Sequence, residues 1–272
     1  MSHMTPKMND TPEIIRRAKT FWNPGKHVLT RSFRNHPMNL VHPEHPLVRL
    51  DGKLIYFDTG APTSLVPDEI VALLSAHGLP VTSMSPSTQA LFTSARNTLK
   101  SLIGIEMDAL IGMDVIAQTG LCYDRAKGHL GWGDETTPIG AIELHSRCVM
   151  GLPVVEMEID GQRVSAILDT GCHEVGYFLD LPKDLRAGEI IRDANPIIGE
   201  FETTSRYAAA KILAKDGSII DLGECKFGDA PPIVAMALRV ARVRGVVGSA
   251  VTARCLTIFK DSTVFVIHSS QR

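Results

Sequence analysis

The chain has 272 residues, of which 44% are hydrophobic and 21% are charged. These values are typical of a globular protein with a sizeable core, and the length suits two domains of ordinary size. A net charge of −2 argues against a nucleic-acid partner, which requires a concentrated basic surface. Because no apolar run approaches the ~20 residues that cross a bilayer, we also expect no membrane partner.

Five cysteines are scattered through the chain without a C-x-x-C pair. An odd and dispersed set of this kind favours reduced thiols over a disulfide framework or a zinc site. The N-terminus lacks the apolar core of a signal peptide. We therefore expect a cytoplasmic protein without a metal or other cofactor.

Residues 1–26 are expected to form an N-terminal arm that contains a short helix. Thr11 is a suitable N-cap, and Pro12 suits the first helical position. An arm packed on the rest of the protein is favoured over an inhibitory pro-segment. The following segment, residues 35–46, is rich in proline and carries three histidines. Because no Cys or pair of acids joins these histidines at a defined spacing, an ordinary surface loop is favoured over a metal site.

Three hairpins with Asp-Gly turns are predicted further along the chain. An Asp-Gly pair between two apolar runs favours a tight two-residue turn. The three turns are at Asp51-Gly52, Asp160-Gly161 and Asp216-Gly217. The strands that these turns join are expected at 47–50 and 53–57, at 154–159 and 164–168, and within 212–220.

Helices are expected to be few and short. Pro67 and the two acids after it predict a helix that ends at Gly78. Two brief helices are expected at 113–119 and 249–254. Residues 79–105 are rich in Ser and Thr and indicate no definite element. The glycines and proline of residues 133–140 are typical of a connection between two halves of a chain.

Two motifs occur twice. Asp58-Thr59-Gly60 ends an apolar strand, and Asp169-Thr170-Gly171 ends another 111 residues later. Leu110-Ile111-Gly112 follows the first, and Val246-Val247-Gly248 follows the second. A chain that contains two copies of one unit is expected to fold as a pseudo-dimer with its site between the copies.

These paired motifs resemble those of the aspartic peptidases, the pepsin and retropepsin clan, in which each lobe contributes one Asp-Thr/Ser-Gly and one apolar-apolar-Gly. The resemblance covers about residues 27–268. It implies a mostly β fold, a bilobal, pepsin-like double β-barrel made of two retropepsin-like lobes. The first lobe is expected at residues 27–135 and the second at 140–268.

The resemblance implies an aspartic endopeptidase that cleaves extended peptides or unfolded proteins. Asp58 and Asp169 are then the catalytic pair that holds the attacking water. Since two carboxylates at close range cannot both ionise, one serves as acid and the other as base. Both are in one chain, so catalysis requires no dimer. The residues expected to support the two active-site loops are Thr59, Gly60, Ala61, Thr170, Gly171, Cys172, Gly112 and Gly248.

The sequence departs from the clan pattern after the second Asp. Cys172-His173-Glu174 stands where a run of small Ser or Thr residues is usual, either as substrate-binding residues or as a sign that the site has decayed. This leaves open a catalytically inactive peptide-binding protein of the same fold. A hydrolase of non-peptide substrates is a third, weaker interpretation, because fold alone does not fix chemistry.

Two further expectations concern the cover of the site and its working pH. The second copy has more residues between its Asp and its Gly, which predicts a substrate-covering flap at 200–222. A short hairpin within 82–95 is the alternative. Ala61 and Cys172 replace hydroxyl-bearing residues of the acid-acting pepsins, so the pair is expected to work at weakly acidic or neutral pH.

Overall fold

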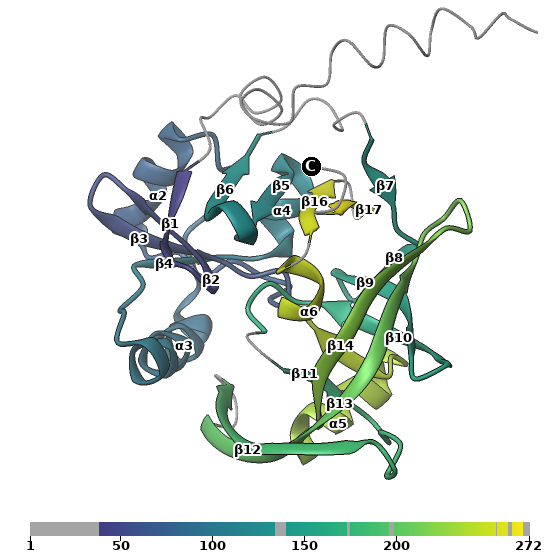
Figure 1. Ribbon diagram of the computed structural model, residues 1–272. Helices are drawn as coiled ribbons and strands as arrows, with labels where there is room; N and C mark the ends of the chain where they lie inside the picture. The colour runs from purple at the N-terminus through teal and green to yellow at the C-terminus, as the bar shows by residue number, and fades with distance from the viewer. Residues whose placement is uncertain are drawn as a thin grey trace, which may run out of the picture.

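The computed structural model describes residues 38–133, 140–172, 175–195, 199–253, 255–260 and 263–268. The expected N-terminal arm, most of the expected connection at 133–140, and His173 and Glu174 lie outside these residues. The fold is mostly β and contains two sheets (Figure 1). We call residues 38–133 the first repeat and residues 140–268 the second repeat.

In the first repeat, helices and strands alternate along the chain after the first three strands. Its elements are β1 (Met38–His42), β2 (His45–Leu50), β3 (Lys53–Phe57), α2 (Asp68–Ala76), α3 (Pro86–Ile103), β4 (Ala109–Ile111), α4 (Met113–Thr119), β5 (Leu121–Asp124), the 3-10 helix η1 (Arg125–Lys127) and β6 (His129–Trp132).

The second repeat has more strands and fewer helices. Its elements are β7 (Ile142–Glu143), β8 (Ser146–Val149), β9 (Leu152–Ile159), β10 (Gln162–Leu168), β11 (Gly176–Phe178), β12 (Arg186–Asn195), β13 (Gly199–Leu213), β14 (Ile219–Asp229), α5 (Pro232–Ala241), β15 (Gly245–Val247), α6 (Ser249–Thr252), β16 (Cys255–Lys260) and β17 (Thr263–His268).

The structure confirms the three hairpins with Asp-Gly turns. Asp51 and Gly52 both have positive φ, 45° and 86°, and so do Asp160 and Gly161, 47° and 80°. This backbone shape matches the twist of the flanking strands, and Asp and Gly tolerate it well. The third turn, around Gly217, joins β13 and β14. Helix α2 and the two brief helices α4 and α6 are also where the sequence predicts them.

The expected loop at 35–46 is wrong over its described part. Residues 38–42 and 45–50 form the antiparallel strands β1 and β2, and β1 also pairs with β6. Pro43 lies in the turn between them, where its missing N–H costs no ladder hydrogen bond. His45 is buried, and its ring is hydrogen-bonded to the Tyr56 hydroxyl at 3.2 Å.

The segment without a definite prediction contains the longest helix in the described part of the chain, α3. The alternative of a hairpin within 82–95 is therefore wrong. Phe92, Ala95 and Leu99 recur at helical spacing and pack against the β2–β3–β4 face. Gly104 ends the helix in the left-handed conformation. Neither α3 nor any other described helix is both long and apolar enough to span a membrane.

The two repeats share one sheet. Its strand order is β4-β3-β2-β1-β6-β5-β16-β17-β7, so β5 of the first repeat pairs with β16 of the second. Leu121 lies opposite Phe259, and Tyr123 lies opposite Thr257. The spacing of the apolar-apolar-Gly motifs maps Leu121 onto Thr257 and Tyr123 onto Phe259. When the two repeats are exchanged, each of these two residue pairs becomes the other, as in a two-fold symmetric interface.

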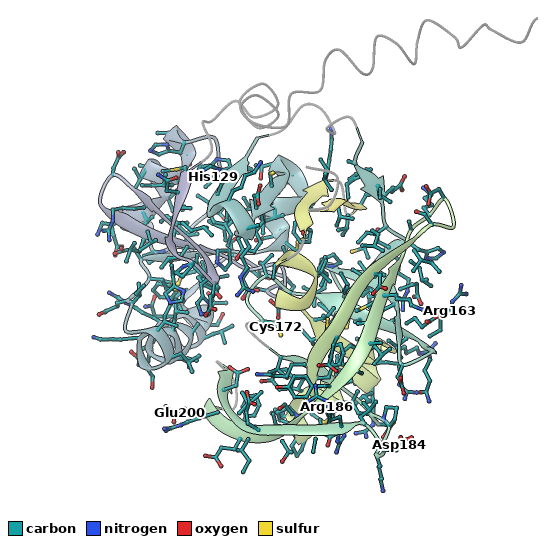
Figure 2. All side chains as sticks on the ribbon, viewed as in Figure 1. His129, Arg163, Cys172, Asp184, Arg186 and Glu200 are labelled. Atoms are coloured by element: carbon teal, nitrogen blue, oxygen red, sulfur yellow. The ribbon has the colours of Figure 1, made fainter. Side chains whose placement is uncertain are left out.

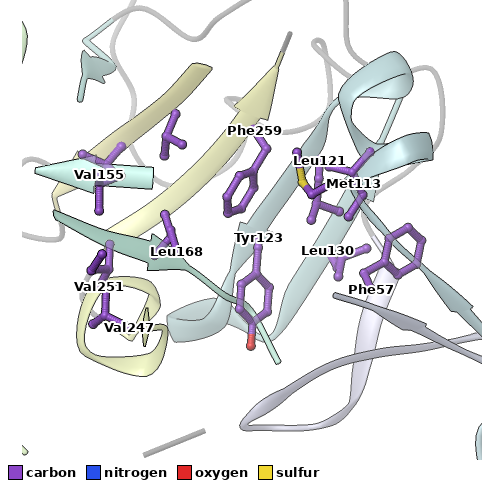
Figure 3. Close-up of a cluster of buried hydrophobic side chains, with 14 of the residues drawn as sticks. Phe57, Met113, Leu121, Tyr123, Leu130, Val155, Leu168, Val247, Val251 and Phe259 are labelled. Carbon is purple, nitrogen blue, oxygen red and sulfur yellow. The ribbon is translucent and has the colours of Figure 1, made fainter. Parts of the chain in front are cut away.

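The main cluster of buried hydrophobic side chains extends across this boundary. Phe57, Leu121 and Tyr123 of the first repeat belong to the same buried cluster as Leu168 and Phe259 of the second (Figure 3). The main core is therefore shared, and smaller buried clusters lie within one repeat, under α3 in the first and under α5 in the second. Burial of this shared apolar surface holds the two halves in one arrangement.

The second sheet belongs to the second repeat alone. Its order is β12-β13-β14-β11-β15-β10-β9-β8, and a further pairing of β13 with β9 joins strands that are distant in this order. The described strands of the first repeat have no corresponding pairing. The mostly β prediction is confirmed, whereas the predicted pair of closed barrels is not.

Candidate active site

The two Asp-Thr-Gly motifs occupy equivalent positions in the two repeats. Strand β3 runs parallel to β4, and β10 runs parallel to β15. The N–H of Asp58 donates to Ile111 O at 2.9 Å, and the N–H of Asp169 donates to Val247 O at 2.9 Å. Each aspartate thus leaves its strand beside the apolar-apolar-Gly motif of its own repeat.

Two buried threonines join the loops reciprocally. The Thr59 hydroxyl donates to Leu168 O at 2.7 Å and accepts the N–H of Thr170 at 2.9 Å. The Thr170 hydroxyl donates to Phe57 O at 2.9 Å and accepts the N–H of Thr59 at 3.1 Å. Each hydroxyl therefore satisfies one donor and one acceptor from the facing loop. The sequence predicts this locking role, and the contacts match it.

The two glycines let the carboxyl groups approach each other. A Cβ on Gly60 would lie 2.2 Å from Asp169 Cγ, and a Cβ on Gly171 would lie 3.0 Å from Asp58 Oδ1. Each glycine N–H instead donates to the carboxyl of its own loop, at 2.8 Å for Asp58 and 2.7 Å for Asp169. With no side chain between them, Asp58 and Asp169 lie within hydrogen-bonding distance of each other.

Gly112 and Gly248 lie directly behind the two loops. A Cβ on Gly112 would meet Ala61 O at 2.7 Å, and a Cβ on Gly248 would meet Asp169 O at 2.2 Å. Both obstacles are backbone atoms, which cannot rotate away as a side chain can. The glycines therefore permit the close passage of a second strand, as the sequence predicts.

We expect Gly248→Ala to destabilise the protein more than Gly112→Ala does. The Gly248 variant must displace the backbone of the Asp169 loop, whereas the contact at Gly112 is less severe. Overpacking of this kind costs about 1–3 kcal/mol or more. Urea unfolding of both variants measures the difference, and equal stabilities would contradict the assignment of Gly248 to the tighter passage.

Burial and proximity set the proton content of the aspartate pair. Burial raises the pKa of Asp58 well above its ordinary value, the negative charge of Asp169 raises it further, and the N–H groups of Gly60 and Ala61 lower it. Burial also raises the pKa of Asp169, whereas hydrogen bonds from Asp58, Gly171 and Cys172 lower it. Two carboxyl groups at this range share one proton, and their titration belongs to the pair and not to either residue.

Ala61 and Cys172 give the carboxyl groups no hydroxyl donor. Ala61 contributes only its backbone, and the Cys172 thiol donates to Val175 O at 3.0 Å rather than to Asp169. Burial raises the pKa of Cys172, and the carboxylates of Asp169, Asp193 and Asp58 raise it further. The thiol therefore stays protonated, which makes it a poor nucleophile.

A polar contact behind the first loop was not predicted from the sequence. The Ser64 hydroxyl donates to Asp114 Oδ1 at 2.6 Å and accepts the N–H of Gly112 at 2.9 Å. The equivalent positions in the second repeat are Val175 and Ala250. The difference is visible when the two repeats are aligned, so this Ser–Asp contact belongs to the first repeat alone.

The expected flap at 200–222 is wrong in its boundaries. The turn between β13 and β14 lies beside strand β7, where Lys215 N donates to Glu143 O at 2.9 Å. The opposite end of β13 and its partner β12 reach the first repeat. There Ser101 Oγ on α3 donates to Glu200 Oε1 at 2.8 Å. Figure 2 shows Glu200 at this end of the hairpin, and Cys172 nearer the centre of the molecule. The hairpin of the second repeat that reaches across to the first repeat is β12–β13.

The comparisons with known proteins assign no family. No family model matches the chain, and no curated protein matches it significantly in sequence. Among the described residues, no group of three or more His, Cys, Asp or Glu side chains could hold a metal ion. The assignment of a function therefore depends on the geometry of the two loops.

Proposed function

We propose that the protein is an aspartic endopeptidase of pepsin-like, two-lobed organisation, with Asp58 and Asp169 as its catalytic pair. The observation that carries the proposal is the reciprocal locking of two Asp-Thr-Gly loops, which brings two half-buried carboxyl groups within hydrogen-bonding distance. Turns that only connect strands gain no stability from such a pair, because two like charges at close range cost free energy.

The proposed reaction uses the single proton that the pair shares. The ionised carboxylate removes a proton from a water molecule as the water oxygen attacks the carbonyl carbon of the peptide bond. The protonated carboxyl donates its proton to the carbonyl oxygen, giving a neutral tetrahedral diol. Collapse of the diol returns one hydroxyl proton to a carboxylate and transfers a proton to the amine that leaves. The pair ends in the protonation state in which it began.

The proposed substrate is an extended segment of a peptide or an unfolded protein. An extended segment can hydrogen-bond through its backbone to strands beside the site, while alternate side chains enter pockets. The β12–β13 hairpin, which reaches α3 of the first repeat, is the element best placed to contact such a segment. The mechanism requires no cofactor, and one chain supplies both carboxyl groups.

A peptide digest tests the proposed function. A peptide library or casein is incubated with the protein between pH 3 and 8, with and without a statine-type inhibitor that mimics the tetrahedral diol. We expect cleavage that the inhibitor abolishes. Peptide binding without any cleavage would instead favour the inactive peptide-binding protein. Cleavage that resists the inhibitor and also persists in Asp58→Asn and Asp169→Asn would exclude these residues as the catalytic pair.

The pH profile of kcat/KM is expected to peak at weakly acidic or neutral pH. Activity is lost on the acidic side when both carboxyl groups become protonated, so a raised pKa moves the acidic limb upward. In Ala61→Ser and Cys172→Thr a new hydroxyl can donate to the charged form, which lowers the pKa. The acidic limb should then move to lower pH. A wild-type peak below about pH 4 contradicts this explanation.

A further inference from the structure

Helix α5 is apolar on both of its faces, although the sheet covers only one of them. Its only polar side chain is that of Arg239. On the inner face Leu238 is buried against Val154 and Ile167 of strands β9 and β10. A helix that is hydrophobic all round is normally covered all round. The outer face of α5 is therefore unusual for a helix at the surface.

The outer face carries a continuous row of apolar side chains, which we call the α5 stripe. Its four exposed residues follow the i, i+3, i+4, i+7 spacing of one helix face: Ile233, Met236, Ala237 and Val240. Met236 is 60% exposed and Val240 is 69% exposed, although apolar side chains gain free energy from burial. The stripe extends for about 10 Å along the helix. A contiguous exposed patch of this kind marks an interaction site.

Three exposed arginines lie at the C-terminal end of the α5 stripe. Arg239 is in the last turn of the helix, Arg242 directly follows it, and Arg244 is two residues further on. Arg244 pairs with Asp180 at 3.6 Å. In the described part of the chain, neither Arg239 nor Arg242 has an ion-pair partner. This end of the stripe therefore carries a net positive charge.

Arg242 occupies a backbone position that glycine usually fills. Its φ is 55°, in the left-handed region, and its N–H donates to Arg239 O at 3.2 Å. Glycine or asparagine is the usual residue at such a helix end, because a side chain is strained there. An arginine at this position costs stability that a glycine would not cost, which favours a role for the guanidinium group.

We propose that the α5 stripe is a docking surface for an amphipathic helix of another protein, with acidic side chains flanking the apolar face of that helix. A helix fits because a ridge of side chains at this spacing packs into the groove of a second helix. Acidic side chains fit because they would pair with Arg239 and Arg242. The inference is independent of the proposed function, since it gives α5 no part in peptide cleavage.

Two other occupants fit the α5 stripe less well. A second copy of the chain would bring a second set of arginines to the contact. The acids beside α5 are already paired, Asp180 with Arg244 and Asp229 with Arg206. A helix that lies on a membrane presents a broad apolar face with aromatic side chains, whereas the stripe is one row without an aromatic residue. Charge complementarity therefore favours an acidic partner helix.

Two synthetic peptides test the inference. Both are held helical by a hydrocarbon staple and carry the same row of Leu and Ala, but one has Glu beside the row and the other has Lys. Fluorescence anisotropy at low salt gives Kd, with a statine-type inhibitor present so that binding at the aspartate pair does not contribute. We expect the acidic peptide to bind at least about tenfold more tightly, because the exchange turns attraction into repulsion at two arginines.

Matched variants locate the contact on α5. Met236→Gln should weaken binding of the acidic peptide about tenfold, as for a central residue of an interface. Ile219→Gln, at an exposed isoleucine on β14, should leave the affinity unchanged. Arg242→Gly should weaken binding about threefold, while its Tm stays equal to that of the wild type or rises. Arg49→Gln, at an exposed arginine of the first repeat, should not change the affinity.

Three results with the peptides would overturn the inference: equal binding of both, no binding of either below about 1 mM, or binding that Met236→Gln leaves unchanged. Self-association in sedimentation velocity that Met236→Gln abolishes would assign the stripe to a second copy and would also overturn it. So would binding to phosphatidylglycerol vesicles that depends on Met236 and Arg239. The peptide digest is a separate measurement, so a failure of the proposed function leaves this inference standing.

Discussion

Asp58→Asn is expected to lower kcat for peptide cleavage at least about a thousandfold, the scale of a lost general acid–base step, while raising stability at neutral pH. Asn has nearly the shape of Asp and can still accept the N–H of Gly60. Its amide group can donate to Asp169 in place of the shared proton. The variant therefore keeps the loop geometry but cannot exchange protons with water and substrate.

The gain in stability follows from the sign of the pKa shift. A raised pKa means that the folded state binds protons more tightly than the unfolded state, in which Asp has its ordinary pKa near 3.8. The free energy of unfolding is then greatest below that pH and falls as the pH rises toward the folded-state pKa. Asn removes this loss, so the advantage of the variant should increase from about pH 4 upward.

Thermal unfolding of the wild type and Asp58→Asn at a series of pH values measures the effect. Each 1 kcal/mol corresponds to about 2–4 °C in Tm for a chain of this order of length. Asp184→Asn, at an exposed carboxyl group, should change neither Tm nor activity. A lower Tm for Asp58→Asn at pH 7, or cleavage at the wild-type rate, would contradict the shared-proton description of the pair.

Thr59→Val is expected to have the largest effect on stability. The substitution keeps the shape of the side chain but removes the hydrogen-bond partner of two buried groups, Leu168 O and the N–H of Thr170. An unsatisfied buried group costs about 1–3 kcal/mol, so a loss of about 2–6 kcal/mol is expected for the two groups. The two loops also lose their alignment, and kcat should fall with them.

The matched controls are Thr59→Ser and the double variant with Thr170→Val. Serine retains the hydroxyl and should keep most of the stability and activity. The four hydrogen bonds act as one unit, so the double variant should be less destabilised than the sum of the single variants. Strict additivity in urea unfolding, or a Ser variant as unstable as Val, would show that the threonines do not lock the loops together.

The sequence predicts the centre of the molecule because the same local signals occur twice there. Asp51-Gly52 and Asp160-Gly161 specify their turns through residues that accept positive φ. The paired motifs then place Asp58 and Asp169 at equivalent strand ends. These are short-range patterns, and a repeated pattern is much more informative than a single one.

The periphery is harder to predict because tertiary packing decides it. Helix α3 has mainly polar and Ser/Thr residues with weak helix preference, and it is stabilised by burying Phe92, Ala95 and Leu99 on the sheet. The sequence does not predict strand β1, because the histidines and prolines of residues 35–46 obscure the alternation of apolar and polar residues that indicates a strand. The sequence predicts the flap too late in the chain, at 200–222. It shows that the second repeat has spare length, but it does not show that β12–β13 is the hairpin that contacts α3.

The self-matching register of β5 and β16 has a consequence for how the protein unfolds. Neither repeat can melt alone without exposing a strand edge in the middle of the nine-stranded sheet and the apolar side chains beneath it. A half-open intermediate is therefore costly, and the two halves should be lost in one cooperative transition. Under the proposed peptidase function this cooperativity would also be protective, because partly unfolded copies of the protein would themselves be substrates.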